Sequence, residues 1–376
     1  MPEHDYYEIL RITRDADGDA VRAAYRALCK RYHPDTGRPG ASARTMQLVN
    51  AAYAVLSDAQ RRKAYDALRP GSPARRARAA TRRAGDATLD LGQGLRMPLA
   101  RVPAGEFLMG SCVPGDGPAT GEGCSCERRA LWLGEYLIGM YPVTVAEYAA
   151  FVAATGRRST PWARRAYSFD PASLDEPDRI VHLDRNWQHP FGGASSVVAK
   201  GEHPVLVVTW FDAVAFCDWA GEVTGAMVRL PTAAEWQKAA RGVDGRCYPW
   251  GNGQPGAGRC NYRAGDAGRA RGGDTTPVGS FSPRGDSPFG CADMLGNVWE
   301  WTSTRTRDRQ GNLLFGDPYR SDDGREEREG RDFRLLMGGS FESPYDAFCC
   351  GSGRDQEPWR ARDTGFRVCV APRPTP

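Results

Sequence analysis

Apolar positions in the first seventy residues recur with the period of a helix. Over residues 17–32 they fall at intervals of four, three and four, which predicts an amphipathic helix. Pro34 ends this helix, because it lacks an amide donor and disfavours helical geometry in the residue before it. A second helix is predicted over residues 41–56, so the pattern indicates an antiparallel helical hairpin. The facing apolar positions are Val21, Tyr25, Leu28 and Tyr32 in the first helix, and Met46, Val49, Tyr53 and Leu56 in the second.

From residue 88 onward the pattern changes to short alternating segments, turns and bulky aromatic residues. Residues 95–111 alternate like a β-hairpin. Thr144 is placed to cap a helix, and Thr232 followed by Glu235 has the spacing of a capping box. The rest of this region has the composition of loops, so the region is expected to be rich in loops. Helices are expected over residues 142–156, 209–221 and 230–242.

Charge is distributed unevenly along the chain. Residues 1–85 carry 17 Lys and Arg against 9 Asp and Glu, and the remaining residues carry 33 against 37. Residues 69–87 contain six arginines, several Pro and Gly, and no aromatic residue on which a base could stack. This segment is therefore expected to be a basic flexible linker, and nucleic acid is not expected as a partner.

The cysteine content and the hydropathy of the chain indicate the cellular compartment of the protein. Eleven cysteines, an odd number scattered over 376 residues, do not resemble a secreted disulfide framework. No apolar run approaches the ~18 residues of a membrane span, and residues 1–10 lack the basic and apolar regions of a signal peptide. These features predict a cytoplasmic protein with no membrane contact.

Three segments of the first region resemble a J-domain over residues 4–68, and they read DYYEIL, AVRAAYRALCKRYHPD and VNAAYAVLSDAQRRKAYDAL. The resemblance implies a co-chaperone module that stimulates the ATPase of a DnaK-type chaperone. It assigns His33, Pro34 and Asp35 to the trigger loop, and Arg22, Arg26 and Lys30 to the docking face. The physics agrees, because a cationic stripe steers an acidic partner.

The large region, residues 88–373, resembles the formylglycine-generating enzyme (sulfatase-modifying factor) family. The segments that carry the resemblance include VPAGEFLMGS, NWQHPFG, HPVLVVTW, DMLGNVWEWT, MGGSF and TGFRV, in that order. The resemblance implies an elaborated C-type-lectin-like domain of the α+β class. For an active member it also implies the oxygen-dependent conversion of a substrate cysteine to formylglycine.

The same family implies calcium. In DMLGNVWEW, Asp293 and Glu300 supply two carboxylates, and Gly296 and Val298 supply carbonyls between them. Calcium takes six to eight oxygen ligands in relaxed geometry, so this loop is a plausible half-site. Asn261 and the carbonyl of Tyr262 match the start of a second family site, whose acidic member is ambiguous between Asp266 and Asp274.

The copper site of the family is not reproduced. In the sulfatase-modifying members, two cysteines five positions apart follow the Gly-Gly-Ser strand and bind copper. Counted from Ser340, those positions hold Ser343 and Phe348 here. Cys349 and Cys350 are the candidates for a catalytic role, but consecutive side chains diverge, which suits a two-thiolate clamp poorly. Copper is therefore not expected, and the interpretation leans against an enzyme.

Three hypotheses follow. The first is a J-domain co-chaperone whose second domain binds an unknown protein or peptide ligand. The second is an oxygen-dependent oxidase or other redox enzyme acting on polypeptide cysteines that a chaperone presents. The third is a binding protein diversified by a retroelement, because residues 343–355 are all encodable by codons ending in a pyrimidine. The candidate ligand-binding residues are Ser343, Tyr345, Asp346, Phe348, Cys349, Cys350, Arg354 and Trp359.

Overall fold

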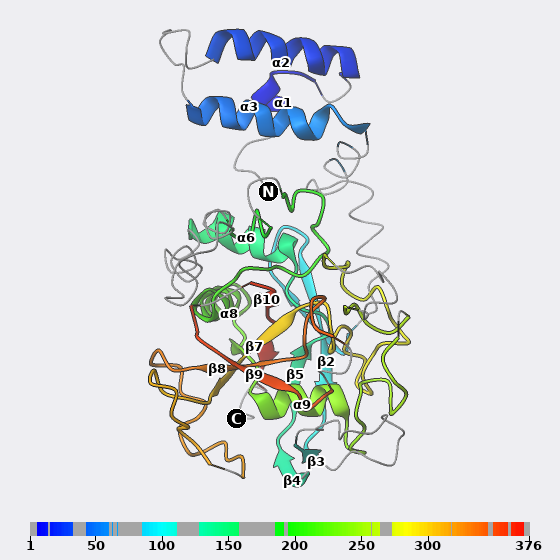
Figure 1. Ribbon diagram of the computed structural model, residues 1–376, viewed down its shortest axis with the longest axis vertical. Helices are drawn as coiled ribbons and strands as arrows, with labels where there is room; N and C mark the ends of the chain where they lie inside the picture. Colours follow the sequence, from blue (N-terminus) through cyan, green and yellow to red (C-terminus); the bar gives the residue numbers. More distant parts are fainter. Residues whose placement is uncertain are drawn as a thin grey trace, which may run out of the picture. The chain divides into compact units, whose positions relative to one another are not determined.

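The structure is a computed structural model of the 376-residue chain (Figure 1). It describes residues 6–13, 16–32, 43–59, 62, 66, 85–110, 128–157, 185–191, 195–256, 258–263, 273–316, 318–344, 349–359 and 362–371. The chain divides into two compact units, residues 1–82 and residues 83–376, which are described separately below.

The first unit contains the predicted helical hairpin. The helices are α1 (Tyr6–Leu10), α2 (Gly18–Tyr32) and α3 (Ala43–Leu56). Val21 and Leu28 of α2 are buried, whereas Tyr25 is only partly buried and stacks on Tyr53 of α3, with 4.0 Å between ring centroids. The hydroxyl of Tyr25 also donates to Asn50 Oδ1 at 3.0 Å. The hairpin is therefore closed by an apolar core with an aromatic pair at its edge, and the predicted all-α class of this unit is confirmed.

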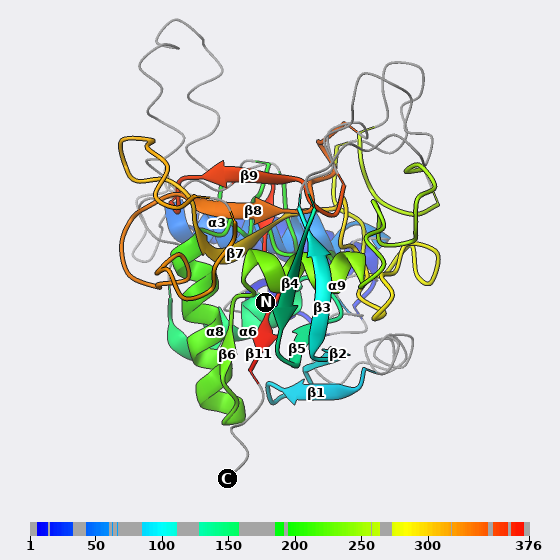
Figure 2. The ribbon, with the colours of Figure 1, turned by 90° about the horizontal axis from the view of Figure 1, so that it is seen from below.

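The second unit is α+β and rich in loops, as predicted, and its described strands form three sheets (Figure 2). A five-stranded antiparallel sheet has the order β1-β2-β5-β11-β6, a four-stranded sheet has the order β10-β7-β8-β9, and β3 pairs with β4. Only the β10–β7 pair among the described strands is parallel. The strands are β1 (Ala87–Asp90), β2 (Arg96–Val102), β3 (Gly105–Met109), β4 (Arg129–Leu133), β5 (Tyr136–Gly139), β6 (Val228–Arg229), β7 (Trp299–Arg305), β8 (Arg334–Met337), β9 (Gly353–Gln356), β10 (Thr364–Gly365) and β11 (Cys369–Val370).

The alternation over residues 95–111 produces two strands, but they do not pair with each other. Strand β2 pairs with β1 and β5, and β3 pairs with β4. Gly105, with φ of 143°, stands at the junction in a backbone conformation that other residues rarely adopt. The chain therefore leaves one sheet and enters another, and the predicted hairpin is wrong in its pairing.

Three helices of the second unit begin at capping boxes. They are α6 (Val145–Thr155), α8 (Trp210–Thr224) and α9 (Ala233–Arg241). Thr144 and Thr232 act as the predicted N-caps. Thr209, which was not predicted as a cap, forms a third box with Asp212. Helix α8 continues past Gly221 and ends at Thr224, and the capping residue Gly225, with φ of 66°, has the left-handed conformation common after helix ends.

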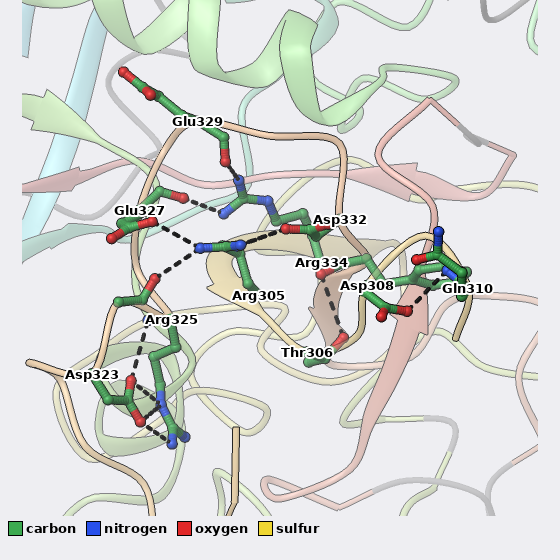
Figure 3. Close-up of polar contacts among 12 residues, drawn as sticks. Arg305, Thr306, Asp308, Gln310, Asp323, Arg325, Glu327, Glu329, Asp332 and Arg334 are labelled. Atoms are coloured by element: carbon green, nitrogen blue, oxygen red, sulfur yellow. Dashed lines mark hydrogen bonds and ion pairs between the residues drawn. The ribbon is translucent and has the colours of Figure 1, made fainter. Parts of the chain in front are cut away.

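Arginine side chains stabilise the long segment between β7 and β8 through ion pairs and hydrogen bonds (Figure 3). Arg305 pairs with Glu327 at 2.9 Å and with Asp332 at 2.5 Å. Arg334 is fully buried, donates to the carbonyls of Ser303 and Glu327, and lies 4.0 Å from the centre of a Trp210 ring. Burial lowers the pKa of Arg334 to about 10. These contacts hold β8 in place and so position the turn that follows it.

No helix among the described residues is both long enough and apolar enough to cross a membrane.

Candidate functional site

The predicted docking face lies on α2. Arg22, Arg26 and Lys30 are exposed and follow one another at intervals of four, so they share one side of the helix. Arg22 also pairs with exposed Asp19 at 2.6 Å, although its own side chain is 56% exposed. His33, Pro34 and Asp35 lie outside the described residues. The cationic stripe therefore has the predicted arrangement, and the trigger loop stays a prediction.

The turn after β8 is built around Ser340 and Ser343. Gly338 and Gly339, with φ of 95° and 74°, lead from β8 into this turn, and a side chain at Gly338 would press on Met294 and Trp236. The amide of Ser340 donates to Ser343 Oγ at 3.0 Å, and the amide of Ser343 donates to the Ser340 carbonyl at 3.0 Å. Both residues are buried. The Ser343 hydroxyl thus closes a turn at the position to which the resemblance assigns the first copper-binding thiol of an active member.

A polar chain runs outward from this turn. The Ser340 hydroxyl donates to the Asp363 carboxylate, and Arg354 lies 3.6 Å from the other Asp363 oxygen. The Arg354 guanidinium carbon also lies 4.8 Å from the centre of the Trp299 ring. Arg354 is exposed whereas Asp363 is buried, so the chain links the interior of the turn to the surface of β9. Sequence reasoning missed Asp363, which stands next to the TGFRV motif.

The two adjacent cysteines are buried. Cys350 is fully buried, and burial raises the pKa of its thiol, so that it stays protonated near neutral pH. The Cys349 sulfur accepts from the amide of Gly351 at 3.4 Å and from the hydroxyl of Ser352 at 3.5 Å. An oxidant or metal in solution reacts first with an accessible thiolate, so the buried, protonated Cys350 is not expected to be the first thiol attacked.

The structure describes only some of the remaining candidate ligand-binding residues. Trp359 is partly buried, and with exposed Arg354 it lies in the segment that follows the two cysteines. Tyr345, Asp346 and Phe348 lie outside the described residues. The structure thus brings Ser343 and Arg354 to one polar chain, and a binding role for Tyr345, Asp346 and Phe348 stays a prediction.

The predicted calcium carboxylates are already engaged. Glu300 is fully buried and accepts from Arg367 at 2.6 and 2.7 Å and from the Trp236 indole at 2.7 Å. Asp293 is buried and accepts from the Gly279 amide at 2.7 Å, and burial raises its pKa to about 7. A guanidinium on both Glu300 oxygens supplies the positive charge that calcium would supply. The arrangement therefore does not fit Glu300 as a calcium ligand, and calcium binding by this loop stays a prediction.

The two predicted calcium loops do lie against each other. A side chain at Gly296 would come within 2.2 Å of the Asn261 carbonyl, and the Asn297 amide donates to that carbonyl at 2.8 Å. The Asn261 amide group donates to the Asp274 carbonyl and to Asn297 Oδ1. Among the described residues, no group of three or more His, Cys, Asp or Glu side chains is arranged to hold a metal ion. Asn261 and Gly296 thus pack against each other, whereas Tyr262 and Val298 belong to different apolar clusters of the core.

Comparison with known proteins places both units. The family model for "Sulfatase-modifying factor enzyme 1-like domain" matches residues 97–372, and that for "DnaJ domain" matches residues 5–66. The "Formylglycine-generating enzyme" of Thermomonospora curvata is 36% identical over 230 residues, which cover 56% of this chain and 72% of that protein. The "Inactive C-alpha-formylglycine-generating enzyme 2" of Bos taurus is 32% identical over 302 residues, which cover 72% of this chain and 93% of that protein.

Among solved structures, PvdO from Pseudomonas aeruginosa has a similar fold. It aligns with a TM-score of 0.54 at 22% identity, over 77% of this chain and 100% of that one. A likeness at this identity shows the fold alone, and that fold agrees with the predicted C-type-lectin-like class of the large domain. The chain belongs to the formylglycine-generating enzyme (sulfatase-modifying factor) family and carries a DnaJ domain at its N-terminal end.

Proposed function

We propose that this chain is a co-chaperone that recruits a DnaK-type chaperone through its DnaJ domain and binds polypeptide on a non-catalytic formylglycine-generating-enzyme-like domain. The observation that carries the proposal is the turn closed by Ser343. Its hydroxyl accepts a hydrogen bond from the Ser340 amide at the position where an active member would present a thiolate to copper. A hydroxyl is a hard and poorly ionised ligand, whereas Cu(I) selects soft sulfur.

The relatives support a domain without this activity. The match to the inactive bovine protein extends over 93% of that protein. A protein named as inactive therefore matches this chain at 32% identity, close to the 36% of the formylglycine-generating enzyme from Thermomonospora curvata. Function in such a domain is expected to reside in binding.

Strand β9 offers a place where a polypeptide can bind. It pairs with β8 on one side and is the last strand of its sheet among the described strands, as Figure 2 shows. An edge strand presents main-chain N–H and C=O groups with which an extended chain can pair. Unfolded polypeptide supplies such groups without regard to sequence, which suits the client of a chaperone system.

The charged residues of β9 indicate which part of this strand would contact a bound polypeptide. Asp355 is neutralised by Arg307 at 2.6 Å. Arg354 has its guanidinium stacked on Trp299, and its side chain is 43% exposed. Arginine held against an aromatic ring at a surface is typical of interface hot spots. We therefore expect Arg354 to contact the bound polypeptide.

The proposal is tested by the affinity of the full chain for a fluorescently labelled, permanently unfolded polypeptide, without chaperone present. Arg354→Ala should weaken binding by more than ~1 kcal/mol, which is about fivefold or more. The matched control is Arg328→Ala, because Arg328 also has an exposed side chain and pairs with a carboxylate, that of Asp218 at 2.7 Å. Absence of binding by the wild-type chain, or equal losses in the two variants, would refute this function.

A further inference from the structure

A third cysteine lies beside the adjacent pair. The amide of Cys350 donates to the carbonyl of Cys247 at 2.8 Å, although the two residues are about a hundred positions apart. Cys349 and Cys350 belong to one apolar cluster of the core, and Cys247 packs against it partly buried. All three thiols are reduced in this structure. Two separate segments of the chain thus bring together thiols that the proposed function does not use.

A single main-chain hydrogen bond brings the backbones of Cys247 and Cys350 into direct contact. A disulfide requires such closeness, because it spans Cα separations of only roughly 4.4–6.8 Å. The Cys247 segment is itself held in a fixed turn, because the amides and carbonyls of Tyr248 and Gly251 bond to each other in both directions at 3.0 Å. The two cysteines thus lie on neighbouring stretches of backbone, one of which is fixed in a turn.

Cys350 is better placed than Cys349 to be the partner. Consecutive side chains point in divergent directions, so only one of the two can face Cys247. It is Cys350 whose main chain bonds to Cys247. The Cys349 sulfur instead accepts hydrogen bonds from the Gly351 amide and the Ser352 hydroxyl within its own turn.

Access distinguishes the two thiols of the pair. Cys350 is fully buried, whereas Cys247 is partly exposed. A guanidinium nitrogen of Arg128 donates to the Cys247 sulfur at 3.6 Å. Cys247 is therefore the thiol that an oxidant reaches first, and Cys350 is placed to react with the product.

We propose that Cys247 and Cys350 are the attacking and resolving thiols of a reversible disulfide. A hydroperoxide, ROOH, oxidises the Cys247 thiol to a sulfenic acid and leaves as ROH. The Cys350 sulfur then displaces water from that sulfenic acid, and the S–S bond forms with loss of both thiol protons. A small dithiol returns the pair to the reduced state and is itself oxidised to a disulfide.

The bond would anchor the segment that leads into β9. Cys350 stands three residues before Gly353, where β9 begins, so oxidation ties that strand to the turn containing Cys247. Its effect on polypeptide binding rests on the proposed function, whereas the bond itself does not. The two are separable, because the disulfide is read by mass and needs no ligand.

The experiment treats the reduced full chain with hydrogen peroxide, blocks remaining thiols and maps cross-linked peptides by tandem mass spectrometry. We expect a peptide containing Cys247 joined to one containing Cys349 and Cys350, lighter by two hydrogen atoms than the reduced pair and separated by dithiothreitol. Cys349→Ala should retain the cross-link, and Cys350→Ala and Cys247→Ala should lose it. Cys217→Ala, at a buried cysteine of the other core cluster, should retain it.

Loss of the cross-link in Cys349→Ala with retention in Cys350→Ala would overturn the assignment of the partner. Oxidation of Cys247 to sulfinic acid in the wild-type chain, with no cross-link, would overturn the proposal itself. The wild-type mapping decides this without any variant, so a variant that fails to fold does not weaken the test.

Discussion

Replacing His33 with Gln should abolish the stimulation of ATP hydrolysis that residues 1–82 confer on a cognate DnaK-type chaperone. His33 begins the His-Pro-Asp sequence directly after α2. The exposed cations of α2 are expected to steer and orient the partner, and the His-Pro-Asp sequence is expected to supply one specific contact. Loss of the His33 side chain should therefore remove the response without removing the hairpin, whose core lies in buried residues of all three helices.

Salt and a charge-reversal control make this test specific. Stimulation by the wild type should fall as rising salt shortens the Debye length to about 8 Å and below. Arg26→Glu should reduce it strongly, whereas Arg96→Glu in the full chain, the same charge change on exposed Arg96 of the other unit, should not. Equal ATPase rates with the wild type and His33→Gln would contradict the assignment.

Glu300→Gln should destabilise the second unit by roughly 3–5 kcal/mol, because it removes one partner of a buried ion pair. Both the Glu300 and Arg367 side chains have essentially no exposed surface, and they lie 2.6 Å apart. Glutamine preserves the shape but leaves the Arg367 guanidinium buried without its counter-charge. All ten tryptophans lie after residue 130, so the tryptophan fluorescence of the full chain follows the unfolding of this unit alone.

The matched control is Asp218→Asn, the same chemical change in the exposed pair with Arg328. It should cost only ~0–1 kcal/mol, because exposed pairs contribute little. The loss in Glu300→Gln should be equal with calcium and with a chelator. A loss seen only in calcium would instead make Glu300 a calcium ligand, as the sequence had suggested.

Rules that depend only on residues close together in the sequence predicted the helices and their caps well. The capping boxes at Thr144 and Thr232 depend on residues three positions apart, and the hairpin of the first unit depends on neighbouring helices, so both could be recognised in the sequence. The pairing of β2 with β5 and the path past Gly105 depend on strands far apart in the chain. Alternation marks a strand but does not specify its neighbour.

The same limit explains what was missed at the site. Glu300 was interpreted from the surrounding loop, which contains oxygen ligands and no cation, whereas its actual partner is 67 residues away. Asp363 and Cys247 likewise reach the site through distant segments. The left-handed conformation of Val207, with φ of 58°, has no sequence signal, because branched residues avoid it. The replacement at Ser343 was visible because it occurs inside a contiguous motif.

The most direct test of the central claim, that the second domain binds without catalysing, is an aldehyde assay with a cysteine-containing peptide. The reduced full chain is incubated with Cu(I), oxygen and the peptide, beside the formylglycine-generating enzyme of Thermomonospora curvata as a positive control. We expect the peptide cysteine to remain unchanged by mass spectrometry, and oxygen uptake to equal that of a copper blank. Formation of peptide formylglycine, lost in Cys349→Ala or Cys350→Ala, would contradict the account.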